Sequence, residues 1–272
     1  MDTLFPKVAT GFEVLAAIVS AALYLVVAVA AVARAPRDIR ARVFLVTAVA
    51  SAAPYSVTVL LWARGANASF TMWVMGLVGL SLMFGSLTLF HFTQVFPWRR
   101  PWIRSHGKWL IAGYALVPIA MAVAFWFLAP LFTALNGMAT AESTGSGGLG
   151  AVSAGISESL VLLLVVLPAL FVLGLVLPFV AVFSLYKSWL LAKAAHQEPA
   201  RITTFWILIS QMAGGVLTIL VVPLLHFVAP TGPWATIAAV LLFATGLLMP
   251  LTFAAAVWKH GVLDFNPEIP PV

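Results

Sequence analysis

The stretch from residue 72 to residue 108 constrains the fold more than any other part of this chain. It begins with a predominantly apolar run, Met72 to Phe96, and stops abruptly at Pro97-Trp98-Arg99-Arg100-Pro101-Trp102. A helix of roughly 20 apolar residues crosses the hydrocarbon core of a bilayer, which is about 30 Å thick. Proline ends a helix, tryptophan prefers the headgroup layer and arginine prefers the cytoplasmic side. The stretch therefore predicts a membrane-spanning helix of defined depth and direction.

The same pattern of apolar runs and short polar breaks recurs along the whole chain. Of its 272 residues, 63% are hydrophobic and only 8% are charged, whereas a soluble domain carries roughly 25% charged residues. We therefore expect a single all-α domain, 1–272, that is a polytopic membrane protein with a seven-transmembrane-helix bundle. The expected spans are 11–33, 43–62, 72–96, 109–132, 160–186, 203–228 and 234–258, with a flexible outer loop at 133–159 and a tail at 259–272.

The basic residues predict how this bundle is oriented. All of the 14 lysines and arginines except Lys7 and Arg64 lie after the first, third, fifth or seventh expected span. Because positive charge is retained on the cytoplasmic side, the N-terminus is expected outside and the C-terminus in the cytoplasm. The charges are thus interpreted as topology signals in short loops, and nucleic acid is not an expected partner.

Ionisable residues within the expected spans are few and lie near the span ends. Glu13, Glu158 and His226 fall at a similar outer depth, close to Trp73, and these four residues are a candidate ligand-binding pocket. No nucleophile, phosphate-loop or metal-ligand motif is found, so we expect no catalytic residues, no metal and no enzyme activity.

Cofactor binding is not expected either. A bis-histidine haem needs two histidines at one depth, but His91 lies near the inner face and His226 near the outer face. Microbial rhodopsins share the span count and orientation expected here, but they carry a retinal-bearing lysine in the middle of the last span. The first lysine near span 234–258 is Lys259, at its end.

Two short stretches carry a resemblance to a known family. Leu89-Phe90-His91-Phe92-Thr93-Gln94-Val95-Phe96-Pro97, followed by Arg99-Arg100-Pro101, resembles the inner end of the third helix in the seven-helix N-terminal membrane sensor domains of bacterial histidine kinases. Ala256-Val257-Trp258-Lys259-His260-Gly261-Val262-Leu263-Asp264-Phe265 is similar to the exit of that family into its signalling linker. The resemblance implies a multi-pass protein of the bacterial inner membrane. It also implies a partner or output face at His91, Phe96, Pro97, Arg99, Arg100, His260 and Asp264.

The chain departs from that family after its last span. A catalytic output domain would follow there, whereas this sequence continues only to Val272. The main hypothesis is therefore a receptor-like signalling protein that passes an outer or intramembrane signal to a protein partner at its cytoplasmic face. The alternatives are a non-catalytic structural subunit of a larger membrane complex and a transporter component.

Overall fold

Every secondary-structure element that the structure describes is a helix. The structure is a computed structural model, and it describes residues 11–64, 68–103, 105–119, 122, 176–216 and 233–264. Its elements are α1 (Gly11–Arg34), α2 (Ile39–Arg64), α3 (Ala68–Val95), α6 (Leu177–Ala194), α7 (Glu198–Val216), α9 (Pro233–Trp258) and the 3-10 helix η3 (Val262–Asp264). Residues 105–119 are helical as well. The all-α class expected from the sequence is confirmed for this part of the chain.

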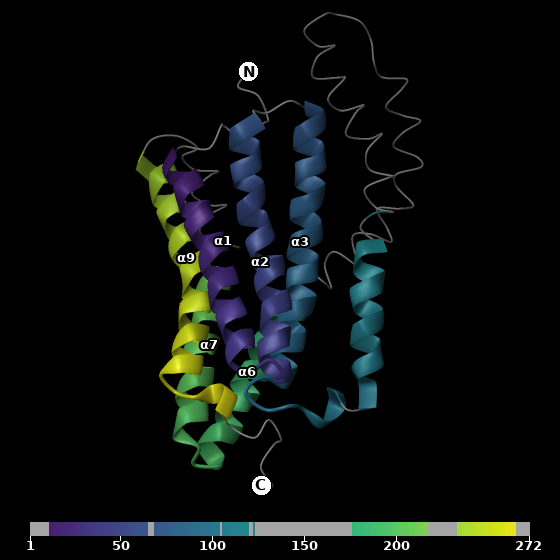
Figure 1. Ribbon diagram of the computed structural model, residues 1–272, viewed down its shortest axis with the longest axis vertical. Helices are drawn as coiled ribbons and strands as arrows, with labels where there is room; N and C mark the ends of the chain where they lie inside the picture. The colour runs from purple at the N-terminus through teal and green to yellow at the C-terminus, as the bar shows by residue number, and fades with distance from the viewer. Residues whose placement is uncertain are drawn as a thin grey trace, which may run out of the picture.

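The long helices pack side by side as a closed ring (Figure 1). Helix α1 contacts α2 and α9, α3 contacts α2 and α6, and α7 contacts α6 and α9. The helical segment 105–119 lies outside this ring beside α3, where Gly113 would bring a Cβ atom to 3.3 Å from Leu87. The turn between α1 and α2, the end of α3 and η3 all lie at the lower end in Figure 1, which we call the hub end.

The helix bounds extend beyond the predicted spans at the hub end and also at the opposite end of α3, which begins at Ala68 instead of Met72. Helix α1 begins at the expected residue, but α2 begins at Ile39, four residues before the expected start. Helix α6 continues past Tyr186 to Ala194, and α7 begins at Glu198 instead of Thr203. Apolar length marks only the part of a helix that fits the hydrocarbon layer, so polar turns at the ends are missed.

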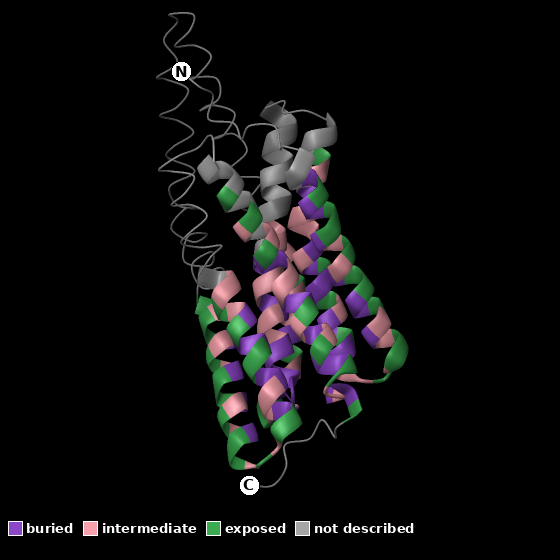
Figure 2. Ribbon diagram, turned by 90° about the vertical axis from the view of Figure 1, so that its left-hand side faces the viewer, coloured by how far each residue is buried: buried purple, intermediate pink, exposed green. Residues whose placement is uncertain are grey.

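A cluster of phenylalanines fills the ring near the hub end. Phe44 of α2, Phe92 at the end of α3, Phe96 just after it and Phe253 of α9 are all fully buried. The rings of Phe44 and Phe253 stack with centroids 3.5 Å apart, and Phe92 meets Phe253 edge-on at 5.6 Å. Figure 2 shows that buried positions face the inside of the ring of helices and that exposed positions lie on its outer surface. The cluster joins α2, α3 and α9 directly.

Helix α1 is the clearest candidate for a membrane span. Its segment Val14–Arg34 is long and apolar enough to cross a bilayer, with a mean hydropathy of 2.6, and no other helix meets that test within the described residues. The apolar part of α9, Phe243–Trp258, is shorter. Helix α1 thus points to association of the chain with a membrane.

Candidate functional site

The turn between α1 and α2 places a charged pair at the start of α2. Asp38 precedes the first helical residue, and its Oδ1 accepts the backbone N–H of Arg40 at 2.7 Å. This is the hydrogen bond of a helix N-cap, which satisfies an amide that has no partner within the helix. The same carboxylate accepts the Arg40 side chain, from Nε at 3.0 Å to Oδ1 and from Nη2 at 2.6 Å to Oδ2. Asp38 therefore both starts α2 and orients Arg40.

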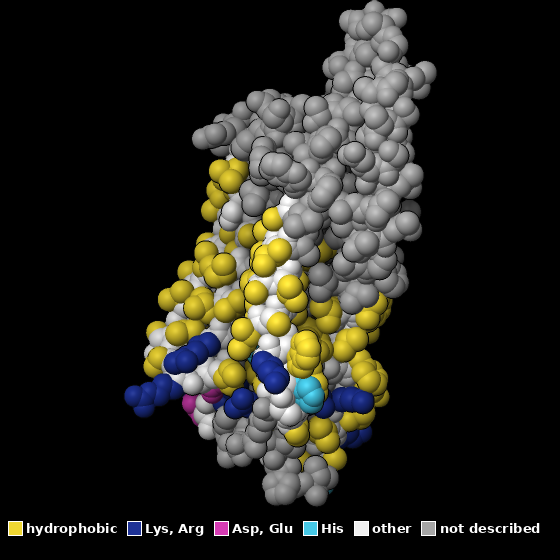
Figure 3. Space-filling view, turned by 90° about the vertical axis from the view of Figure 1, so that its right-hand side faces the viewer, with side chains coloured by type: hydrophobic (Ala, Val, Ile, Leu, Met, Phe, Trp, Pro, Cys, Tyr) yellow, Lys and Arg dark blue, Asp and Glu magenta, His cyan; other side chains and the backbone are white. Residues whose placement is uncertain are grey.

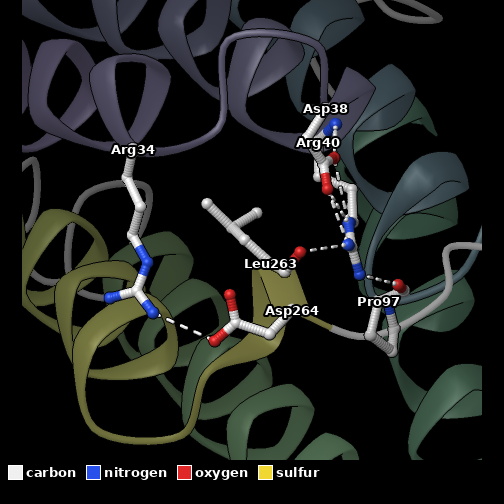
Figure 4. A network of polar contacts seen from close by, with 6 residues as sticks. All are labelled: Arg34, Asp38, Arg40, Pro97, Leu263 and Asp264. Atoms are coloured by element: carbon white, nitrogen blue, oxygen red, sulfur yellow. Dashed lines mark hydrogen bonds and ion pairs between the residues drawn. The ribbon is translucent and has the colours of Figure 1, made fainter.

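Arg40 is fully buried and joins three distant segments of the chain (Figure 4). Its Nη1 donates to the Pro97 carbonyl oxygen at 3.0 Å, and its Nη2 donates to the Leu263 carbonyl oxygen at 3.1 Å. Pro97 follows α3, and Leu263 belongs to η3 after α9. We call Arg40 with Asp38, Pro97 and Leu263 the Arg40 hub.

The hub satisfies the requirements of a buried charge. An isolated buried guanidinium would carry a large desolvation cost, which only close pairing and additional hydrogen bonds offset. Arg40 has both, because a carboxylate balances its charge and backbone carbonyls accept its remaining N–H groups. Arginine suits this role because its planar fork presents several donors at fixed angles and stays ionised. Loss of Asp38 would remove the ion pair of buried Arg40, and loss of Arg40 would remove the cation beside Asp38.

A second contact ties η3 to α1. Arg34, the last residue of α1, donates from Nη2 to Asp264 Oδ2 at 2.9 Å, and both side chains are exposed. Gly261 lies before η3 with φ of +59°, a left-handed conformation that disfavours other residues. Its carbonyl accepts the backbone N–H of Asp264 at 2.9 Å, which closes the turn. The exit of α9 is thus held from two sides, by Arg34 and by Arg40.

The loop after α3 is also fastened to α6. Arg100 Nη2 donates to the Ser184 carbonyl oxygen and to the Ser188 hydroxyl, each at 2.9 Å. Gln94 Nε2 reaches the Ser184 hydroxyl at 2.8 Å, and the Gln94 carbonyl accepts the backbone N–H of Arg100. Burial lowers the pKa of Arg100 below its usual value, but arginine starts so high that it remains a cation at neutral pH. Polar contacts and the phenylalanine cluster at the hub end therefore link α1, α2, α3, α6 and α9.

The residues expected at the output face separate into distinct environments. Pro97 and Asp264 take part in the contacts that hold η3, Phe96 belongs to the buried phenylalanine cluster, and Arg100 binds α6. His91 instead pairs with the segment outside the ring, because its Nδ1 lies 2.8 Å from the Tyr114 hydroxyl.

For Arg99 and His260, no side-chain hydrogen bond or ion pair is found within the part of the chain that the structure describes. Arg99 is half-buried, and its Nε has no hydrogen-bond partner among the residues described. His260 is half-buried, and its backbone N–H donates to the Ala255 carbonyl oxygen. The expected output face is thus partly a structural joint and partly a set of separate side chains.

The expected outer pocket falls largely beyond the described part of the chain. Glu158 and His226 lie outside the described residues, while Glu13 and Trp73 lie on α1 and α3 at positions whose side chains are not described. No group of three or more His, Asp or Glu side chains with metal-binding geometry occurs within the ranges that the structure describes. The outer pocket therefore stays a prediction.

The central residue of the hub was missed by reasoning from the sequence. Arg40 was interpreted as one of four loop arginines that set topology, yet it lies inside α2 and is fully buried. One signal was available, because an Asp before an apolar periodic run is a typical N-cap and would have started the helix at residue 39. The contact with Leu263 had no such signal, since 223 residues separate the partners.

Comparisons of the chain with protein-family models, with curated proteins and with solved structures found no match.

Proposed function

We propose that this chain is a receptor-like protein of the bacterial inner membrane that passes a signal from its helices to a protein partner at its cytoplasmic face. It would cross the membrane seven times, with the N-terminus outside and the hub end in the cytoplasm. It would carry out no chemistry itself. The single observation that carries the proposal is the Arg40 hub, which fixes the exit of α9 to the α1–α2 turn and to the end of α3.

The outer surface of the ring supports membrane insertion. Large apolar side chains are widely exposed on it, among them Val26 of α1 at 65% and Phe179 of α6 at 65%, and Ile111 of the segment beside the ring is 70% exposed. A helix on the surface of a soluble protein would place polar residues there. Figure 3 shows one face on which lysine and arginine side chains gather toward the hub end, below an extended hydrophobic surface. That distribution favours lipid contact along the helices and cytoplasm at the hub end.

The hub supports transmission because it makes three chain segments move together. A shift of α1–α2 or of α3 cannot leave Arg40 in contact with both carbonyl oxygens unless η3 follows or a hydrogen bond breaks. Closely packed interfaces respond to such shifts by switching between discrete arrangements. The tail that leaves η3 would thus report the packing of the ring to a partner.

The phenylalanine cluster weighs against the transporter alternative. Four fully buried rings fill the ring of helices near the hub end, whereas a transporter needs a path that opens to water at that end. The alternative of a structural subunit predicts a rigid hub end with one arrangement. A receptor needs two arrangements, so the two hypotheses can be separated by measurement.

Spin-label distances test the receptor directly. The chain contains no cysteine, so cysteines placed at Ser105 and Lys259, both exposed at the hub end, can be labelled specifically in native-like bilayers. We expect two distance populations whose ratio changes in Arg34→Gln, because that variant removes only an exposed ion pair and leaves the fold nearly as stable. A single distance that is identical in both proteins would contradict the receptor and favour the structural subunit.

Photo-crosslinking tests the cytoplasmic partner. A benzophenone side chain at Lys259, which is exposed beside η3, should give a protein adduct in intact cells, while the matched control at Trp109 on the lateral surface should not. The orientation is tested with the same cysteines placed one at a time at Ser105 and Lys259. A membrane-impermeant thiol reagent should label them in inverted vesicles and should not label them in intact cells. Labelling in intact cells would contradict the cytoplasmic placement of the hub end. Equal yields of protein adduct from both benzophenone positions would contradict a partner that binds beside η3.

A further inference from the structure

We propose that a pocket between α2, α3 and the segment 105–119 binds an acyl chain of an anionic phospholipid, with the lipid phosphate on Arg42. The pocket has a volume of about 290 Å³ and is lined by Arg42, Val43, Val46, Phe84, His91 and Tyr114. The inference rests on the proposed function only in placing the pocket in the leaflet at the hub end.

The pocket is an apolar slot, and Arg42, His91 and Tyr114 are the residues with polar groups among those that line it. Phe84 and His91 are seven residues apart on α3, so the slot extends about 10 Å along the helix axis. Tyr114 closes its outer side, with its ring 5.4 Å from Phe84 and its hydroxyl 2.8 Å from His91 Nδ1. Val46 is 40% exposed, so the slot is open to its surroundings along α2. A narrow apolar slot parallel to the helices fits a hydrocarbon chain that runs along the membrane normal.

The charge at the pocket is uncompensated. Arg42 lies in the first turns of α2, and its Nε donates to the Pro36 carbonyl oxygen at 2.7 Å, which holds the guanidinium near the helix start. Its terminal nitrogens have no hydrogen-bond partner among the described residues. The nearest carboxylate in sequence, Asp38, already accepts the Arg40 side chain on both oxygens. Two free terminal NH2 groups in a planar fork match a phosphate.

A phospholipid satisfies both ends of the site at once. A free phosphate would use Arg42 but leave the apolar slot empty, and a neutral amphiphile would fill the slot but leave Arg42 unpaired. Anionic lipids are attracted to basic residues at the cytoplasmic surface, each contributing on the order of a few-fold in affinity. The charge of Arg42 thus favours an anionic headgroup, whereas the slot binds the acyl chain and does not distinguish between headgroups.

Lipid titration followed by native mass spectrometry tests the site on the full chain in detergent. Phosphatidylglycerol should bind more tightly than phosphatidylcholine with the same acyl chains. Arg42→Gln should weaken phosphatidylglycerol binding about five-fold and leave phosphatidylcholine unchanged. Val46→Trp should weaken both lipids because it fills the slot. The matched control is Arg37→Gln, which removes an exposed arginine of the same turn that does not line the pocket.

Three outcomes would overturn the proposal: equal binding of both lipids to the unmodified chain, equal losses in Arg42→Gln and Arg37→Gln, or displacement of phosphatidylglycerol by inorganic phosphate. The last result would assign the site to soluble phosphate instead of a lipid. Because the titration requires neither a partner nor a known orientation, its failure is distinguishable from failure of the proposed function.

Discussion

Replacing Asp38 by Asn should destabilise the protein, and its effect should be strongly non-additive with that of replacing Arg40. Asparagine caps a helix about as well as aspartate, so the N-cap of α2 is retained and only the negative charge is lost. Arg40 is then a fully buried cation that has lost its ion pair with Asp38. Breaking a buried ion pair by removing one partner costs about 3–5 kcal/mol. The Asp38 side chain is 11% exposed, which admits some water and favours the lower end of that range.

The second single variant of this double-mutant cycle removes the cation. Arg40→Met keeps most of the side-chain volume but deprives the Pro97 and Leu263 carbonyl oxygens of their donor, at about 1–3 kcal/mol for each unsatisfied group. In the double variant neither charge remains, so the penalty of an unpaired ion disappears. We therefore expect the double variant to be less destabilised than the sum of the single ones, by a coupling energy of about 3 kcal/mol.

Urea unfolding in mixed micelles, followed by tryptophan fluorescence, measures all four proteins. The linear dependence on urea gives the free energy of unfolding, and an unchanged slope shows that the same surface is exposed in each variant. Additivity within about 0.5 kcal/mol would refute the reasoning. So would an Asp38→Asn variant as stable as the unmodified chain, because Arg40 would then have to be solvated or paired elsewhere.

Variants at three further places in the fold can be measured by the same unfolding assay. Gly246→Ala should cost about 1–3 kcal/mol through overpacking, because its Cβ would collide with the Tyr55 hydroxyl, and Tyr55→Phe in the same chain should recover part of that loss. His196→Gly should raise stability by about 0.5–1 kcal/mol, because His196 has φ of +53° at the end of α6, where glycine is unstrained; a loss of stability would contradict this. Arg100→Met should cost about 1.5–3 kcal/mol, and Ser188→Ala, which removes one of its two acceptors, should cost about half as much; equal stability of the two variants would count against the contact with α6.

The local features of the fold could be predicted from the sequence because neighbouring residues determine them. The apolar run from Gly11 specifies α1, and Pro97 stops α3, since proline lacks the N–H that a helix requires. Pro54 and Pro250 lie inside α2 and α9 as expected from the length of those runs. These features depend on periodicity and on single residues, which can be recognised without knowledge of the tertiary structure.

The candidate site could not be predicted in the same way, because its contacts join residues far apart in the chain. Four arginines between Arg34 and Arg42 look alike in sequence, yet one is buried, one binds Asp264 and one lines a pocket. Only the register of α2 decides which arginine turns inward, and that register depends on the Asp38 cap. His91 likewise found its partner in Tyr114, on a helix whose packing against α3 no local pattern reveals.

The Arg40–Leu263 contact also imposes an order on biosynthesis. A ribosome that adds about 5–20 residues per second needs about 10–45 s to make the 223 residues between them. During that interval the nascent guanidinium lacks one of its final acceptors, so the α1–α2 hairpin must remain hydrated at this end or be shielded by a chaperone. The contacts of the hub end are therefore completed only after α9 and η3 have been synthesised. A nascent chain that is stalled before that point should remain sensitive to proteases at the hub end.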